Sequence, residues 1–181
     1  MVLSDFQKQK LAYIFQLFDV TGDGGVDRDD LTLISQNLAQ ARGYQLGSKE
    51  HSALAAQYQS IWGALEASSG KQRLGLDDWI EVHEHILDDV DMYRQALESS
   101  VGIAFAEMDL DGDGRISLDE YRAFLKGYGV DPSTASVSFA RIDLNGDGSV
   151  SRDEVFQALL EFFTSQERDA PGNWFYGALP E

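Results

Sequence analysis

Three stretches of the sequence place oxygen-bearing side chains at alternating positions and then close with a carboxylate. They lie at residues 19–30, 109–120 and 143–154, and each opens with the pattern Asp-x-x-Gly-Asp-Gly. Calcium is a hard cation that takes about six to eight oxygen ligands, and a 12-residue loop can supply them from positions 1, 3, 5, 7, 9 and 12. The spacing therefore predicts three calcium sites.

Two of these loops satisfy the pattern at every position. The predicted donors in the loop at 109–120 are Asp109, Asp111, Asp113, the backbone carbonyl of Arg115, a water held near Ser117, and both carboxylate oxygens of Glu120. Those in the loop at 143–154 are Asp143, Asn145, Asp147, the carbonyl of Ser149, a water near Ser151, and Glu154. Gly114 and Gly148 stand at the sixth position, where the chain must turn sharply. The Ser and Glu of each loop also match a helix capping box, a role that can coexist with metal binding.

The first loop departs from the pattern at its last position. Its predicted donors are Asp19, the hydroxyl of Thr21, Asp23, the carbonyl of Gly25, Asp27 and Asp30. Asp30 stands where the other loops have glutamate, and its side chain is one methylene shorter. We expect it to reach the ion with a single oxygen, which lowers the coordination number and lets Mg²⁺ compete with Ca²⁺. This site is expected to bind calcium most weakly.

Helical patterns of apolar residues flank the loops. Phe15 and Phe18 precede the first loop, and Leu31, Ile34 and Leu38 follow it at helical spacing. Similar patterns surround the other two loops, so each site is expected to join two helices. The repeated unit predicts a helix-loop-helix motif around each of the three loops.

A fourth, degenerate unit fills the gap between the first and second matched loops. Aligning Leu74 with the apolar eighth position of the other loops sets this loop at 67–78. Its ligand positions then hold Ala67, Ser69, Lys71 and Gly75. Because these side chains offer few oxygens and one positive charge, no calcium is expected there.

The units resemble EF-hands, and the whole chain is similar to the sarcoplasmic calcium-binding proteins and the bacterial calerythrin group. The resemblance rests on the degenerate second unit, on Asp30, on Trp79 after the degenerate loop, and on the aromatic ending at 171–177. It implies calcium buffering or transport. The layout is also similar to that of calcium-triggered photoproteins and luciferin-binding proteins, although Leu159 and Phe163 stand near the places where photoproteins carry a histidine and a tryptophan.

The resemblance implies a compact all-α fold of four EF-hand units in two packed pairs, with short β-bridges between paired loops. The predicted segments are an N-terminal pair at 1–87, a C-terminal pair at 91–165 and an aromatic tail at 166–181. The join at 88–91 is short and lacks Gly and Pro, so we expect the two halves to pack together. The tail should pack on the core, because its clustered rings are costly to leave in water.

Charge and composition favour cations as partners. Fourteen Lys and Arg stand against 31 Asp and Glu, and the net charge of −17 repels nucleic acids and anionic membranes. No apolar run is long enough to span a membrane, and the opening residues lack the pattern of a signal peptide. The chain has no cysteine. A cytoplasmic monomer is expected, and no protein partner is indicated.

Catalysis and other binding chemistries find little support. The Gly-x-Gly pairs in the loops are ringed by carboxylates and lack a following lysine, so they would repel phosphate. His83 and His85 are two residues apart, which places them on different faces of a helix and argues against zinc. No nucleophile or metalloprotease motif is present, so we do not expect an enzyme. The open alternatives to a buffer are a calcium sensor that exposes an apolar surface, and a carrier of an apolar small molecule.

Overall fold

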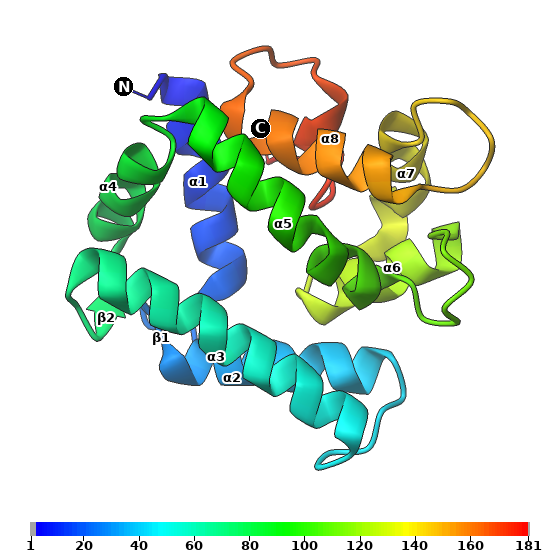
Figure 1. Cartoon of the computed structure of the whole chain (residues 1–181), viewed down its shortest axis with the longest axis horizontal. Helices are drawn as coiled ribbons and strands as arrows, with labels where there is room; N and C mark the ends of the chain where they lie inside the picture. Colours follow the sequence, from blue (N-terminus) through cyan, green and yellow to red (C-terminus); the bar gives the residue numbers. More distant parts are fainter. Residues whose placement is uncertain (1–2, 181) are drawn as a thin grey trace.

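The computed structural model describes residues 3–180 and is mostly helical, which confirms the all-α expectation (Figure 1). Met1, Val2 and Glu181, at the ends of the predicted first and third segments, lie outside the described residues. The longer helices are α1 (Asp5–Phe18), α2 (Arg28–Ala41), α3 (Lys49–Ser69), α4 (Leu76–Ile86), α5 (Val90–Met108), α6 (Leu118–Gly127), α7 (Ala135–Ile142) and α8 (Arg152–Thr164). The short elements are η1 (Pro132–Thr134), η2 (Pro171–Trp174), β1 (Val26–Asp27) and β2 (Arg73–Leu74).

The loops pair through their eighth positions, as expected for EF-hands. Val26 of β1 lies opposite Leu74 of β2 in an antiparallel pair. Ile116 and Val150 form the equivalent bridge, in which the two residues exchange N–H···O bonds of 2.9 and 2.8 Å. The pairing of Val26 with Leu74 confirms the prediction that Leu74 occupies the eighth position of the degenerate loop.

The helices begin at the polar residues that precede each apolar stripe. Ser117 and Ser151 start α6 and α8 with capping boxes, in which the serine hydroxyl accepts a hydrogen bond from the backbone N–H three residues later. On α1 the apolar residues Leu11, Ile14 and Phe15 face the interior and are nearly fully buried. Capping and periodicity therefore fix where the helices begin and which face they bury.

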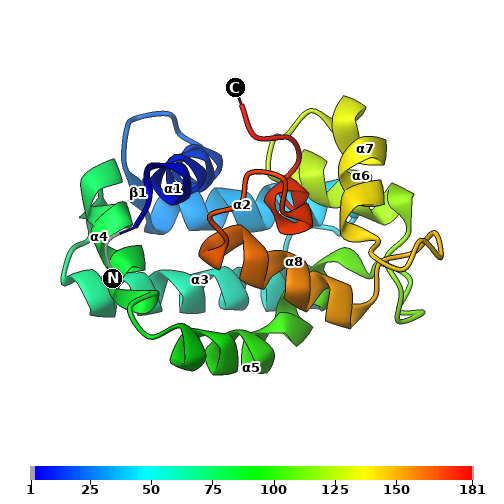
Figure 2. The same ribbon diagram turned by 90° about the horizontal axis from the view of Figure 1, so that it is seen from above.

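Helices from both pairs contribute to one hydrophobic core. Helices α2 and α3 lie side by side, α5 runs along α8, and α2 also packs on α6 from the other pair (Figures 1 and 2). The contact between α2 and α6 is close, because a Cβ on Gly127 would come 2.3 Å from a methyl carbon of Leu38.

The division of the chain into pairs at 1–87 and 91–165 stays a prediction. Since α5 already begins at Val90, the connection between α4 and α5 is shorter than the join expected at 88–91.

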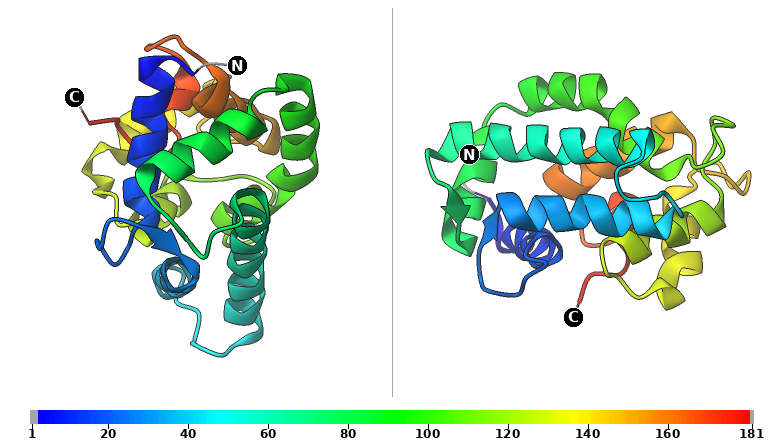
Figure 3. Two further views of the ribbon diagram at one scale, coloured as in Figure 1. Left: turned by 90° about the vertical axis from the view of Figure 1, so that its left-hand side faces the viewer. Right: turned by 90° about the horizontal axis from the view of Figure 1, so that it is seen from below.

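The C-terminal tail packs into the interior beside α8, as the sequence predicts (Figures 1 and 3). Phe175 is only 1% exposed, and its ring meets Phe124 and Tyr176 edge-on. The Tyr121 hydroxyl donates to the carbonyl oxygens of Trp174 and Phe175 at 2.8 and 3.1 Å. The tail is thus held by hydrogen bonds to its backbone as well as by its rings.

A buried lysine ties the first helix to this tail. Lys10 is 1% exposed, and its ammonium group donates to the carbonyl oxygens of Glu161 and Ser165 and to Oδ1 of Asn173. Burial lowers the pKa of Lys10 to about 8, so the group is still charged at pH 7 and carries three protons for three acceptors.

The described residues include no helix that is long and apolar enough to cross a membrane.

Candidate metal centre

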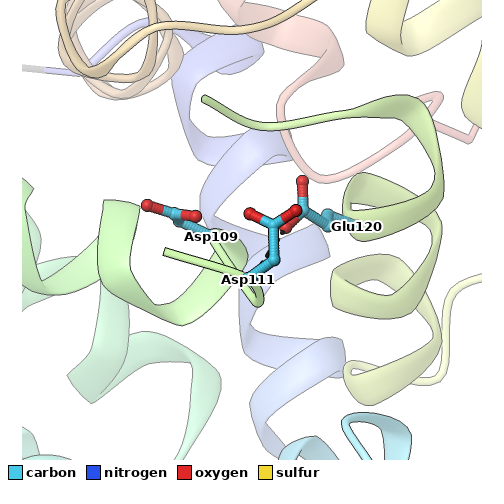
Figure 4. Close-up of side chains that lie close together, drawn as sticks. All are labelled: Asp109, Asp111 and Glu120. Atoms are coloured by element: carbon cyan, nitrogen blue, oxygen red, sulfur yellow. Dashed lines mark hydrogen bonds between the residues drawn. The ribbon is translucent and has the colours of Figure 1, made fainter. Parts of the chain in front are cut away.

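The third loop brings three carboxylates together at one point. Asp109 follows the end of α5, Asp111 lies in the loop, and Glu120 projects from the first turn of α6 (Figure 4). One oxygen from each lies within 4.8 Å of the others. Two oxygens that each lie about 2.4 Å from a calcium ion can be at most about 4.8 Å apart. The spacing of these three groups therefore fits a calcium ion.

Backbone hydrogen bonds hold Glu120 in place for this role. Its Oε1 accepts from the N–H of Leu110 at 2.7 Å, and its Oε2 accepts from the N–H of Ser117 at 2.7 Å. Partial burial works against ionisation, but the hydrogen bonds from Ser117 and Leu110 outweigh it and hold the pKa of Glu120 below its usual value. The carboxylate therefore stays charged and oriented, and the capping role coexists with the predicted metal role.

The fourth loop repeats this arrangement around Glu154. Its Oε1 accepts from the N–H of Leu144 and Asn145 at 2.9 and 3.2 Å, and its Oε2 accepts from the N–H of Ser151 at 2.8 Å. Burial opposes ionisation here too, yet hydrogen bonds from the Ser151 backbone and side chain keep the pKa of Glu154 low. Because Asn145 replaces a carboxylate at the third position, this loop does not form a cluster of three close carboxylates among the described residues.

The sixth-position glycines make the turn that the ligand pattern requires. Gly114 has φ of +81°, a left-handed conformation that L side chains rarely adopt. Its N–H donates to Oδ2 of Asp109 at 3.1 Å, which draws the first and sixth positions together. The other two loops contain the same turn and bond, at Gly24 with Asp19 and at Gly148 with Asp143.

Several predicted ligands are turned toward the loop backbone in this structure. The Asp111 and Asp113 carboxylates accept from backbone N–H groups two residues ahead, at 3.1 and 2.8 Å. Asn145 and Asp147 do the same in the fourth loop, at 2.7 and 3.0 Å. These bonds hold the oxygens inside the loop. The assignment of every ligand, including Asp109, Asp111 and Glu120, stays a prediction.

In the first loop Asp30 makes the contacts that glutamate makes elsewhere. Its Oδ1 accepts from the N–H of Thr21 and its Oδ2 from the N–H of Asp27, both at 3.0 Å, which correspond to the glutamate contacts with the third and ninth positions. Asp30 is 1% exposed, so the shorter side chain sits deep in the loop. Asp23 is engaged differently, because the guanidinium of Arg73 donates to its Oδ1 at 2.6 Å. In this loop, too, no three carboxylates of the described chain lie as close as those of the third loop.

The degenerate loop contains a positively charged lysine side chain at one of its ligand positions. The Lys71 ammonium, at the fifth position, lies 2.5 Å from Oδ1 of Asp78 at the twelfth. Helix α3 continues to Ser69, whereas α1, α5 and α7 each end before the first ligand of the loop that follows them. The helix therefore occupies the first three loop positions, and an ammonium group replaces the metal. Both features agree with the prediction that calcium does not bind there.

The two histidines of α4 point in different directions. His83 is 9% exposed, and its Nδ1 lies 2.7 Å from the carbonyl oxygen of Trp79. Burial lowers the pKa of His83 to about 4, so its ring is neutral at pH 7. His85 is exposed and bonds to the carbonyl oxygen of Glu81. Each histidine is bound to its own helix, and the pair forms no metal cluster in the described chain.

A cavity of about 500 Å³ lies between α3 and α5, and the sequence did not reveal which residues line it. Its lining is mostly apolar, with Leu97, Val101 and Ala104 from α5 and Ile61 from α3. One wall is polar, where Glu107 accepts hydrogen bonds from Gln57 and Tyr58, and Tyr58 bonds to Tyr128. Burial raises the pKa of Glu107 to about 7. The available signal was the spacing of Glu107, which follows Val101 and Ala104 on the same helical face.

Two parts of the chain match models of EF-hand families. Residues 98–160, which hold the third and fourth loops, match an EF-hand domain pair. Residues 12–35, which hold the first loop, match an EF hand. The degenerate loop at 67–78 lies outside both matches. With the geometry above, these matches show that the chain carries EF-hand domains, and EF-hand domains bind calcium.

Individual known proteins are also similar to this chain. The sarcoplasmic calcium-binding proteins I, III and IV of Branchiostoma lanceolatum are 23% identical over 140 residues, which cover 70% of this chain and 72% of theirs. A coelenterazine-binding protein from Renilla muelleri, in its calcium-loaded apo form, is similar with a TM-score of 0.77 and 27% identity, covering 98% of this chain and 100% of that chain. A sarcoplasmic calcium-binding protein from amphioxus has the same fold, with a TM-score of 0.74 at 21% identity over 99% and 100%. Homologues of this chain therefore include the sarcoplasmic calcium-binding proteins, and the predicted resemblance is confirmed.

Proposed function

We propose that this chain is a cytoplasmic calcium buffer that binds three ions, in the loops at 19–30, 109–120 and 143–154. The observation that carries the proposal is the buried tail. A sensor offers an apolar groove to its target, but here Phe175 already lies in the interior, Tyr176 packs partly buried against the core, and Tyr121 holds the tail backbone. A protein whose groove is filled by its own tail can take up calcium without a partner.

Ion counting tests this proposal directly. Native mass spectrometry of the calcium-loaded protein should show one chain with three ions. A titration with calcium in millimolar magnesium should then show one site, assigned to the first loop, weakened far more than the other two. A count of two or fewer would remove the first loop from the proposal, and a dimer would overturn the monomer.

The sensor alternative makes the opposite prediction about exposed apolar surface. If calcium released Trp174 and Phe175, the dye ANS should brighten when calcium is added to magnesium-loaded protein. A buffer with a fixed tail should leave the dye signal unchanged. A rise in fluorescence that is lost on chelation would favour the sensor.

The cavity beside α5 favours carriage of an apolar small molecule as a second candidate function. About 500 Å³ is within the range of pockets that hold small ligands. The wall formed by Glu107, Tyr58 and Tyr128 could orient such a ligand by accepting a hydrogen bond from it. The similar Renilla muelleri protein binds coelenterazine, and the proposal for this chain is limited to the chemical class of an apolar molecule with one donor group.

A cavity-filling variant separates carrier from buffer. Protein isolated from its native source should release an organic molecule that mass spectrometry detects, and Ala104→Phe should reduce its yield by filling the cavity. Ala106→Phe is the matched control, because residue 106 lies on the exposed side of the same helix. Equal ligand yields in both variants would argue against this cavity as the site. Absence of any extracted molecule would leave buffering as the function.

A further inference from the structure

Each pair of loops contains an arginine that reaches across to the partner loop. Arg73 and Arg115 both occupy the seventh position of their loops. Arg73 contacts Asp23, and Arg115 contacts Asp147, so each arginine meets the fifth-position aspartate of the opposite loop. The same relationship in both pairs follows from the antiparallel bridge, which brings the seventh position of one loop beside the other loop.

The contact in the first pair is the tighter one. Nη2 of Arg73 lies 2.6 Å from Oδ1 of Asp23 and 2.9 Å from its carbonyl oxygen. In the second pair Nη1 of Arg115 lies 3.4 Å from Oδ2 of Asp147 and bonds chiefly to the Ser149 hydroxyl at 2.8 Å. Only Asp23 is therefore held directly by a guanidinium group along both its side chain and its backbone.

The first loop is shaped to admit this guanidinium. A Cβ on Gly25 would come 2.5 Å from Nε of Arg73, so a side chain at that position would displace the group. The corresponding residues of the other binding loops are Arg115 and Ser149, which shows that the seventh position itself accepts side chains. The hydrogen bond from Arg73 is also the main cause that lowers the pKa of Asp23.

We propose that Arg73, from the degenerate loop, acts as an intramolecular counter-ion that occupies the Asp23 carboxylate of the first site in the absence of metal. Calcium must displace the guanidinium from Oδ1 before that oxygen can bind the ion. Arg73 therefore weakens the first site and stabilises the metal-free loop. The degenerate loop thus regulates its partner, an inference that rests on the proposed binding of calcium in the first loop.

Two variants test this by different routes. Arg73→Gln removes the charge, and Gly25→Ser keeps the charge but pushes the guanidinium away. Exposed ion pairs contribute little to stability, so each variant should tighten the first site only modestly, by roughly 1.5- to 5-fold. Each should also lower the melting temperature of the chelator-treated protein. Arg28→Gln is the matched control, because the Arg28 side chain pairs with Glu66 at 3.1 Å and bonds to Gln59, and neither partner is a predicted ligand.

The measurement is calcium titration calorimetry combined with an ion count by native mass spectrometry. Three ions in the wild-type protein, with tighter binding in both variants than in Arg28→Gln, would support the inference. Three ions with equal affinity in Arg73→Gln and Arg28→Gln would overturn it and leave the three-site buffer intact. Two ions in the wild type and three in Arg73→Gln would support the inference and correct the buffer stoichiometry. Two ions throughout would overturn both.

Discussion

The ammonium group of Lys10 lies 3.0 Å from Oδ1 of Asn173, and the two residues are 163 positions apart in the sequence. Asn173 is itself fixed, because its Nδ2 donates to the carbonyl oxygens of Glu167 and Arg168. The rings of Phe6 and Phe162 lie 5.0 and 5.5 Å from the same ammonium. A single buried charge thus joins α1, α8 and the C-terminal tail.

Removing this charge should loosen the tail. Lys10→Met keeps the apolar stem but takes the lysine donor from the Ser165 carbonyl and from Oδ1 of Asn173, at a cost of about 1–3 kcal/mol per unpaired group. The Glu161 carbonyl still accepts from the N–H of Ser165. We expect a lower melting temperature and faster proteolysis of residues 166–180. Lys8→Met is the control, because the Lys8 side chain is 41% exposed and its ion pair with Glu84 is 3.7 Å long. Equal proteolysis of the two variants would contradict the role given to Lys10.

Lengthening the last ligand of the first loop should strengthen its site. Asp30 already accepts from the third- and ninth-position N–H groups, as the glutamates do in the other loops, so Asp30→Glu can add a second oxygen to the ion. We expect calcium affinity at this site to rise on the order of tenfold and discrimination against magnesium to increase. Competitive titration in the presence of magnesium measures both. The reverse change, Glu154→Asp, should weaken the fourth site and make it more tolerant of magnesium.

Neutralising Glu120 should disable the third site. Glu120→Gln removes one of the three clustered carboxylates and one oxygen that binds metal well, so calcium affinity there should fall at least about tenfold. The capping contact of Glu120 with Ser117 can survive, since the amide oxygen still accepts a hydrogen bond. Asp119→Asn is a matched control, because Asp119 is exposed beside the site and pairs with Arg122. Native mass spectrometry should lose one ion only in Glu120→Gln, and loss in both variants would argue against the assigned ligand.

The buried histidine should make stability depend on pH. The pKa of His83 is lowered to about 4 from 6.5, so the unfolded chain binds a proton between these values while the folded protein does not. Stability is therefore complete above pH 6.5 and falls as the pH drops toward 4, by about 3 kcal/mol in total. Denaturant unfolding of His83→Gln at pH 7, 6 and 5 should show a smaller loss than the wild type. His85→Gln, at an exposed position, should follow the wild type, and the same slope in all three proteins would refute the prediction.

The loops and their pairing could be predicted from the sequence because both depend on local chemistry. Ligand spacing, the sixth-position glycine and the apolar eighth position all lie within a dozen residues, and the structure contains the bridges that they predict. The extension of α3 to Ser69 was not expected. Without a metal to bind, nothing at the start of the degenerate loop stops the helix before Gly70, whose φ of +69° ends it.

Features that depend on distant parts of the chain could not be read from the sequence. Lys10 has the sequence signature of an exposed helical lysine, and only the position of α8 and the tail makes it buried. The contact of Arg73 with Asp23 depends on the side-chain directions set by the bridge between β1 and β2. Glu107 meets Tyr58 and Tyr128 because helices from both pairs pack together, which no local pattern encodes.

The attachment of α1 to the tail also fixes an order of events during synthesis. Lys10 and Tyr13 are made early, but their partners Asn173 and Tyr176 are translated more than a hundred and sixty residues later. Until those residues leave the ribosome, the ammonium group of Lys10 lacks these hydrogen-bond acceptors. The apolar residues around it are then not yet covered by the tail. The hydrophobic core can be completed only after the tail has been translated. Calcium that binds earlier would bind to an incomplete chain.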